Sequence, residues 1–194
     1  QRVAHILAER GEKLVLADLV TPPMVPAGAK VLTGSLDDTM HEAITSETTA
    51  VIHLAAVVSA GAEADFEHGY HVNLEGLRGV LERCRTLGTC PKFLFTSSLA
   101  VFGAVDRVDD ATAVMPQSSY GTQKAIGELL VNDYSRKGHI RGRTLRLPTV
   151  VIRPGRPNAA ARSFASGILR EPLAGEESIC PVSPDLALWI ASPA

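Results

Sequence analysis

The 194-residue sequence lacks most features that mark membrane, secreted or metal-bound proteins. It has no apolar run near the roughly 20 residues that a membrane-spanning helix needs, and no segment that resembles a signal peptide. Its three cysteines are too few and too irregularly placed for a disulfide framework or a four-ligand zinc site, and its six histidines show no metal-binding spacing. We therefore expect a soluble, cytoplasmic protein that binds no metal.

The sequence also lacks an excess of charge of either sign. Its formal net charge is −2, with 45% hydrophobic and 21% charged residues. This balance gives no electrostatic reason to expect binding to nucleic acid or to an anionic membrane, and leaves small neutral or anionic ligands open. The length is sufficient for one domain with a substantial core.

Apolar strand patterns alternate with helical patterns along the whole chain. This rhythm is typical of an α/β protein with a doubly wound parallel sheet, Rossmann-like, with helices on both faces. Proline and glycine mark loops, and the segment 57–64, with Ser59 and Gly61, is predicted as a loop. The predicted strands are 13–18, 29–32, 50–56, 92–96 and 143–151, and the predicted helices are 1–11, 35–44, 65–84, the segment that contains Tyr120, and 159–170.

The first residues already follow a helical periodicity, with no strand or cap before Gln1. We therefore expect that a preceding segment is missing from this sequence.

Tyr120 and Lys124 lie four residues apart at the start of a predicted helix, so their side chains project from one face. An adjacent ammonium favours the phenolate and lowers a phenol pKa that starts at about 10, which allows the oxygen to take a proton from an alcohol. The alternative is a half-buried tyrosine and a solvated lysine on an ordinary amphipathic helix, whose apolar stripe would include Leu129.

Several predicted strands end in residues that suit a nucleotide site. Asp18 ends the strand 13–18, small residues end the strand 50–56, and Ser98 follows the strand 92–96. The alternatives are a solvated loop acid, tight strand-on-helix packing and a turn-forming serine. Asn73, within the helix 65–84, could join strand backbones together or face water.

Taken in order, Asp18, His53-Leu54-Ala55-Ala56, Thr96-Ser97-Ser98 and Tyr120-x-x-x-Lys124 resemble the extended short-chain dehydrogenase/reductase family, also described as NAD-dependent epimerases/dehydratases. The resemblance covers nearly the whole chain and implies NAD as cofactor. The family's phosphate-binding Gly-x-x-Gly-x-x-Gly turn is absent from this sequence, and we expect it just ahead of Gln1. Residues 1–157 would then form the NAD-binding domain, and 158–194 the start of a C-terminal substrate-binding region.

The resemblance also implies roles for individual residues. Tyr120 would be the base, Lys124 would support it, and Ser98 would orient the substrate hydroxyl. The residues implied in cofactor binding are Asp18, Leu36, Leu54, Ala55, Ala56, Val57, Ser59, Tyr120, Lys124, Leu147, Pro148 and Thr149. The substrate would contact Ser59, Ser98 and Tyr120, and a substrate carboxylate would pair with Arg153, Arg162 or Arg170.

The stretches 68–76, 116–124 and 153–161 are most similar to a group within this family that oxidises C2 of a four-carbon sugar acid with NAD. We therefore expect an NAD-dependent dehydrogenase acting on a small sugar acid, and a homodimer. Two alternatives stay open: a nucleotide-sugar epimerase or dehydratase with tightly bound NAD, and a nonenzymatic NAD-sensing protein on the same fold.

Overall fold

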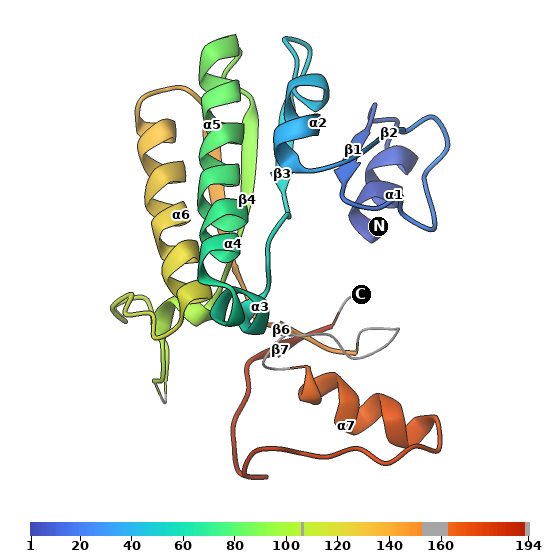
Figure 1. The fold of residues 1–194 in the computed structure, drawn as a ribbon, viewed down its shortest axis with the longest axis vertical. Helices are drawn as coiled ribbons and strands as arrows, with labels where there is room; N and C mark the ends of the chain where they lie inside the picture. Colours follow the sequence, from blue (N-terminus) through green and yellow to red (C-terminus); the bar gives the residue numbers. More distant parts are fainter. Residues whose placement is uncertain (106, 153–162, 193–194) are drawn as a thin grey trace.

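The structure is a computed structural model, and it describes residues 1–105, 107–152 and 163–192. Figure 1 shows the α/β arrangement that the alternating pattern predicts. The strands are β1 (Val15–Asp18), β2 (Lys30–Thr33), β3 (Ala50–His53), β4 (Lys92–Ser98), β5 (Arg141–Leu147), β6 (Thr149–Val150) and β7 (Ile190–Ala191). The helices are α1 (Arg2–Glu9), α2 (Leu36–Ala43), α3 (Ser59–Ala64), α4 (Phe66–Tyr70), the π-helix η1 (His71–Glu75), α5 (Gly76–Leu87), the 3-10 helix η2 (Leu99–Phe102), α6 (Ser119–Arg136) and α7 (Phe164–Leu173).

All strand pairs are parallel, which confirms the predicted class of fold. β3, β4 and β5 form the central sheet in that order, whereas β1–β2 and β6–β7 are separate pairs among the described residues. The short apolar run in residues 13–18 predicts a buried parallel strand, and this prediction is wrong: three of the four residues of β1 are exposed. The physical reason is that β1 hydrogen-bonds to β2 on one edge and to no strand of the described chain on the other.

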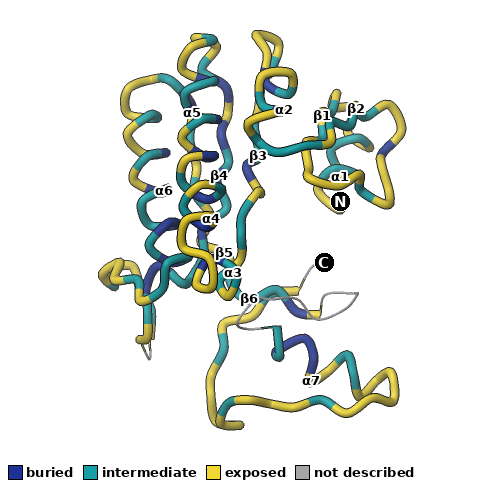
Figure 2. Tube along the Cα trace, viewed as in Figure 1, coloured by how far each residue is buried: buried dark blue, intermediate teal, exposed yellow. Residues whose placement is uncertain are grey.

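The core lies between the central sheet and the helices α5 and α6 (Figures 1 and 2). Phe93 and Phe95 point from β4 toward these helices and are fully buried. Alternate residues of a strand face opposite sides, and Leu94, on the other side, is only half-buried. The cluster around the two phenylalanines consists of Ile44, Leu77, Val80, Leu81, Cys84, Val131 and Ile140.

The helix predicted from residue 65 exists, but it contains an irregular turn. α4, η1 and α5 follow one another directly, and the π-helical η1 places Asn73 in the interior. The spacing of apolar residues in 65–84 at threes and fours predicts that Phe66 lies on the buried face, but Phe66 is exposed. The loop predicted at 57–64 is partly wrong, because Ser59–Ala64 forms the short helix α3. Its sequence, Ser-Ala-Gly-Ala-Glu-Ala, is half alanine, the residue with the highest helix propensity.

The stripe predicted for the Tyr120 helix is also wrong in part. Leu129 is 69% exposed, whereas the buried residues of α6 are Gly121, Gln123, Lys124, Gly127, Glu128 and Val131. This face is polar because its side chains hydrogen-bond to the sheet and to η1, as described below. Hydrophobic periodicity cannot identify such a face, because most of its members are polar or lack a side chain.

The C-terminal part agrees with the sequence prediction less closely. The single strand predicted at 143–151 is interrupted at Pro148, which lies between β5 and β6. The strand β7 was not predicted, and it pairs with β6 across the expected domain boundary. The helix predicted at 159–170 is α7, which begins at Phe164; residues 159–162 lie outside the described part. Across the described residues, no helix has the length and apolarity that crossing a bilayer requires.

Gly127 allows α6 to lie close to β4 and α5. A Cβ atom at this position would lie 2.7 Å from Phe95 Cζ and 2.9 Å from Leu77 Cδ2. We expect Gly127→Ala to destabilise the fold, because overpacking of about 1–3 kcal/mol exceeds the gain of about 0.5–1 kcal/mol in helix propensity. Gly79→Ala on α5 is the matched control, since its nearest neighbour is the flexible end of Met40. Urea unfolding should show a lower midpoint for Gly127→Ala alone; equal midpoints would refute this packing account.

Candidate active site

Three strands of the central sheet end at one edge of the sheet. β3 ends at His53, β4 at Ser98 and β5 at Leu147, and Ser98 is the register partner of Leu147. Because carboxyl ends of parallel strands meet at one edge, residues far apart in the sequence come together here. The ligand sites of open α/β sheets occupy this edge, so we place the candidate site here.

The start of α6 lies directly against η2, which follows Ser98. A Cβ atom on Gly121 would lie only 2.4 Å from the carbonyl oxygen of Ala100, so the approach requires glycine. Ser118 caps α6 by accepting a hydrogen bond from the Gly121 N–H at 3.1 Å. This contact brings Tyr120 within hydrogen-bonding reach of the Ser98 side chain.

Lys124 lies one turn further along α6, and the fold buries it. It is 3% exposed, and its Nζ donates a hydrogen bond to the carbonyl oxygen of Thr96 at 2.8 Å. The same Nζ lies 4.8 Å from the ring centroid of Phe95 and 5.6 Å from that of Tyr120. The alternative of a solvated lysine on an amphipathic helix is therefore wrong.

Burial shifts the pKa values of these groups. It raises the pKa of Tyr120, although the hydrogen bond with Ser98 lowers it in part. It lowers the pKa of Lys124 to about 8. The net direction for Tyr120 is opposite to the direction expected from an adjacent ammonium, because desolvation of the phenolate is the larger effect.

His53 closes the site on the β3 side. It is 4% exposed and stacks between Phe93 and Phe95 at centroid distances of 6.3 and 6.1 Å. Burial, with a smaller contribution from the Lys124 charge, lowers the pKa of His53 to about 4. The imidazole is therefore neutral at physiological pH.

Asn73 joins the loop after β3 to α6. Its Oδ1 accepts from the Val57 N–H at 2.7 Å, and its Nδ2 donates to the Val57 carbonyl at 2.9 Å and to Gln123 Oε1 at 2.6 Å. Neither alternative that the sequence left open holds as stated: Asn73 is buried and does not face water, and it bonds the backbone of the loop residue Val57 and does not join strand backbones. π-helical turns such as η1 are frequent at functional sites.

Asp18 and Leu36 lie on the β1–β2 side. The Gly34 N–H donates to the Asp18 carbonyl at 3.0 Å, which brings the end of β1 to the start of α2. The Asp18 carboxylate is exposed and accepts from the Val20 N–H at 3.4 Å. Leu36 is half-buried and packs against α5, where its Cδ1 would lie 2.9 Å from a Cβ atom on Gly76.

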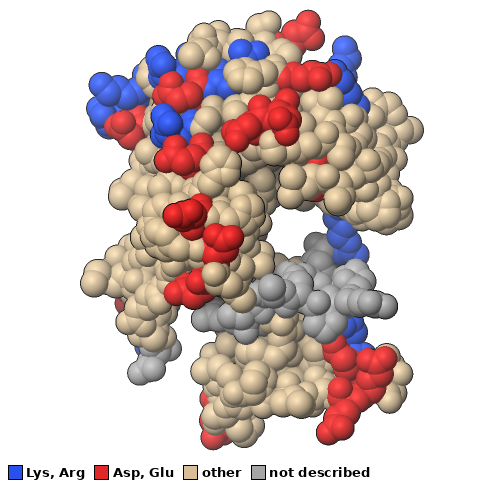
Figure 3. All heavy atoms as spheres, viewed as in Figure 1, with Lys and Arg blue, Asp and Glu red and all other residues tan. Residues whose placement is uncertain are grey.

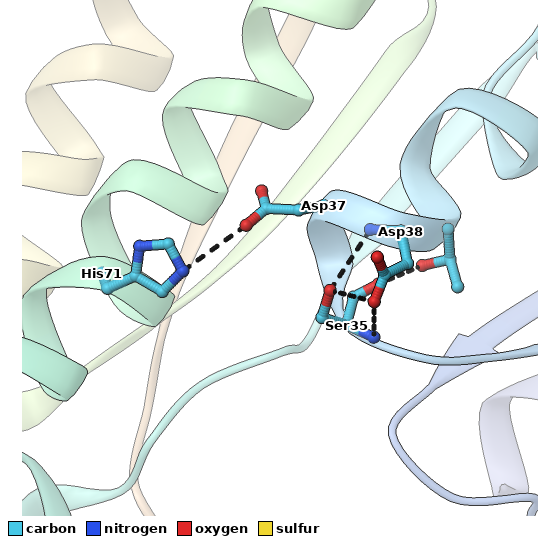
Figure 4. A network of polar contacts seen from close by, with 5 residues as sticks. Ser35, Asp37, Asp38 and His71 are labelled. Atoms are coloured by element: carbon cyan, nitrogen blue, oxygen red, sulfur yellow. Dashed lines mark hydrogen bonds and ion pairs between the residues drawn. The ribbon is translucent and has the colours of Figure 1, made fainter.

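Figure 4 shows the polar network at the start of α2. Ser35 and Asp38 form a capping box at the N-terminus of α2. Asp37 Oδ2 lies 3.4 Å from His71 Nε2, which links α2 to η1. Both side chains of this pair are more than half exposed, so the link contributes little to stability.

The other residues expected to bind the cofactor are partly accessible along the strand-end edge. Leu54 and Ala55 are exposed, and Ala56 and Val57 are half-buried. Beyond β5, Leu147 is 40% exposed, and Pro148 and Thr149 are half-buried. The small residues at 55 and 56 leave the backbone open to a ligand.

The residues expected to bind the substrate are less completely described. Ser59 is the first residue of α3 and is half-buried. Arg153 and Arg162 lie outside the described residues. Arg170 lies on α7, where its guanidinium forms an ion pair with Glu171. A substrate carboxylate at Arg170 would therefore compete with Glu171.

A separate hollow of about 260 Å³ lies beside α1, lined by Ala8, Gly11 to Leu14 and Ala27 to Ala29. It contains none of the candidate residues, so we do not place the site there.

In Figure 3, basic and acidic side chains are interspersed over the end of the molecule where α5 and α6 finish. Exposed pairs at this end include Arg85–Glu82 and Arg136–Asp133.

Within residues 1–105, 107–152 and 163–192, no group of three His, Cys, Asp or Glu residues could hold a metal.

Sequence reasoning missed several polar residues that surround the site. Gln123 is fully buried beside Asn73, and Glu128 hydrogen-bonds to Ser97 and Arg146. The spacing of four residues between Lys124 and Glu128 was the available signal for Glu128, since residues 124 and 128 share a face. This spacing does not identify Gln123.

Comparison with known proteins agrees with this architecture. The model of the NAD dependent epimerase/dehydratase family matches residues 2–189. D-erythronate dehydrogenases of Cupriavidus necator and Haemophilus influenzae are 52% and 47% identical over 208 and 203 residues, which cover 99% and 100% of this chain. The chain spans 64% of the length of each of these relatives.

Solved structures show the same fold. The nucleoside-diphosphate-sugar epimerase from Agrobacterium tumefaciens is 42% identical with a TM-score of 0.90, and the match covers 99% of this chain and 61% of that one. A UDP-glucose 4-epimerase from Thermus thermophilus, solved with NAD, is 25% identical with a TM-score of 0.77, over 88% of this chain and 58% of that one. The chain belongs to the NAD-dependent epimerase/dehydratase family.

Proposed function

We propose that the whole protein is an NAD-dependent dehydrogenase that oxidises the C2 hydroxyl of a short sugar acid such as D-erythronate to the 2-oxo acid. The observation that carries the proposal is the assembly of Ser98, Tyr120 and Lys124 at the carboxyl edge of the parallel sheet. The substrate class is taken from the two relatives, named D-erythronate dehydrogenases, that are 52% and 47% identical to this chain.

In this proposal Tyr120, as phenolate, takes the proton of the substrate C2 hydroxyl. NAD, when bound, supplies the acceptor for the hydride that leaves C2. Ser98 holds the hydroxyl and then the developing carbonyl, while Lys124 stabilises the phenolate and bonds the nicotinamide ribose. Because burial alone raises the pKa of Tyr120, the charged form of Lys124 is needed to counter that shift.

The cofactor would lie along the strand-end edge. The exposed Asp18 carboxylate suits the adenosine ribose hydroxyls, and the start of α2, with Leu36, suits the adenine. The accessible small residues of the segment 54–57 suit the ribose and phosphates, and the segment 147–149 suits the nicotinamide. Ser59 would touch cofactor or substrate. Arg153 and Arg170 are the proposed partners of the substrate carboxylate.

We also propose that the protein is a homodimer in the cytoplasm and binds neither nucleic acid nor membranes. Residues 1–157 would form the NAD-binding domain, and residues 158–194 the start of a substrate-binding region.

The alternative function is that of a nucleotide-sugar epimerase or dehydratase, as the name of the Agrobacterium structure suggests. The curated relatives favour the dehydrogenase, because both are more similar to this chain. A nonenzymatic NAD sensor would have no need of Ser98, Tyr120 and Lys124 together.

Tyr120→Phe removes the proposed base and keeps the ring. We expect turnover of the sugar acid by the whole protein to fall by about 10²–10⁴-fold, the usual contribution of a positioned acid–base group. The affinity for NAD should change little, because most cofactor contacts stay in place. Steady-state rates and calorimetry measure the two effects, with Tyr70→Phe as the control on another tyrosine. Retained turnover in Tyr120→Phe would rule out the assignment.

The 194-residue chain as given contains no Gly-x-x-Gly-x-x-Gly turn to hold the pyrophosphate. We expect this chain alone to bind NAD with a Kd of about 1 mM or weaker, which corresponds to a binding free energy of about −4 kcal/mol. Isothermal titration calorimetry measures this directly. Micromolar binding would show that the described strand ends are sufficient for the cofactor.

A further inference from the structure

A buried carboxylate connects α6 to the two strands that end at the site. Glu128 is 8% exposed, and its Oε1 accepts from Ser97 Oγ at 2.5 Å and from Arg146 Nε at 2.9 Å. Its Oε2 accepts from Arg146 Nη2 at 2.7 Å. We call these three residues, Ser97, Glu128 and Arg146, the carboxylate link.

Each member of the carboxylate link lies next to a residue of the proposed site. Ser97 precedes Ser98, Arg146 precedes Leu147, and Glu128 lies one helical turn after Lys124. Ser97 and Arg146 are also register partners in the β4–β5 ladder. The link therefore fixes α6 to both strands at the level where the strands end.

The link also reaches η2. The Arg146 guanidinium carbon lies 4.8 Å from the ring centroid of Phe102, the last residue of η2. The opposite end of η2 contacts Gly121, next to Tyr120. Arg146 thus holds in place the segment against which the start of α6 packs.

Stability alone is a weak explanation for this arrangement. Glu128 is buried, but the Arg146 side chain is 37% exposed. Water screens the attraction on the arginine side and desolvation of the carboxylate opposes it, so the pair adds little net stability. A bidentate arginine–carboxylate pair, by contrast, fixes geometry in two directions. The other ion pair on α6, Arg136–Asp133, joins residues of the same helix and is more than half exposed.

On this basis we propose that Glu128 is a positioning residue, which holds α6 in register with β4 and β5 so that Ser98, Tyr120 and Lys124 meet. The proposal rests on the proposed function for the roles of those three residues. Sliding of α6 along β4 would change the Lys124–Thr96 hydrogen bond and the Ser98–Tyr120 contact together, because both span the same two elements. Misplacement by about 1 Å can reduce a rate about 100-fold.

A spectroscopic readout separates positioning from loss of charge. Ser98 lowers the pKa of Tyr120, so a displaced Ser98 should raise that pKa. Loss of the Glu128 negative charge by itself would act in the opposite direction, because a nearby anion disfavours the phenolate. In the described part of the chain, charged groups near the start of α6 include Lys124 and Glu63, whose Oε2 accepts from the Ser119 N–H at 3.0 Å. Neither is changed in the variants below.

The experiment compares Glu128→Gln and the milder Ser97→Ala, which removes one hydrogen bond of the link, in the whole protein. Asp133→Asn is the control, since it breaks an exposed ion pair on the same helix. Phenolate absorbance gives the Tyr120 titration, assigned by its loss in Tyr120→Phe. We expect the titration in both link variants to shift to higher pH, toward that of Ser98→Ala. We also expect kcat to fall by about 10- to 100-fold in Glu128→Gln, with KM for NAD within about threefold and no change in the control.

A Tyr120 titration that is unchanged or shifts to lower pH in the link variants would overturn the proposal, even if their melting temperatures fall. If Glu128→Gln does not fold, Ser97→Ala decides by the same criterion. The titration needs no substrate. An unmodified protein that turns over no sugar acid would therefore overturn the proposed function and leave the test of positioning intact.

Discussion

The hydrogen bond from the Lys124 ammonium to the Thr96 carbonyl is the interaction on which the site depends. It ties α6 to β4 in the interior, at 2.8 Å, where an unpaired ammonium would be strongly disfavoured. Because Thr96 lies two residues before the end of β4, the same bond sets how far Tyr120 stands from Ser98.

Other residues of α6 hold the helix in the position that the Lys124–Thr96 hydrogen bond requires. Gly121 and Gly127 bring the helix close to η2 and to Phe95, while Gln123 and Glu128 attach it to η1 and to the sheet. A helix held by polar contacts and glycines has fewer ways to slide than one held by a smooth apolar stripe, since hydrogen bonds have directional preferences. This restriction suits a helix that must place a phenol and an ammonium together.

Most strands and helices could be predicted from the sequence, because β3, β4 and α5 carry clear apolar patterns. The order of Asp18, Ser98, Tyr120 and Lys124 also predicted which residues might share a site. The exposure of β1 could not be predicted, because it depends on which strand edges are paired. The roles of Gln123 and Glu128 could not be predicted either. The sequence does not show whether a polar residue is buried or solvated, and the hydrogen-bond partners of these residues lie up to 50 residues away in the chain.

We propose that this edge of the sheet oxidises an alcohol with net transfer of hydride. The most direct measurement is formation of NADH or NADPH by the whole protein with a panel of short sugar acids and either NAD or NADP. We expect NADH to accumulate steadily with D-erythronate or a close analogue, because a dehydrogenase releases the reduced cofactor. An epimerase recycles the cofactor within the site, so conversion of a nucleotide sugar without net NADH would contradict the account.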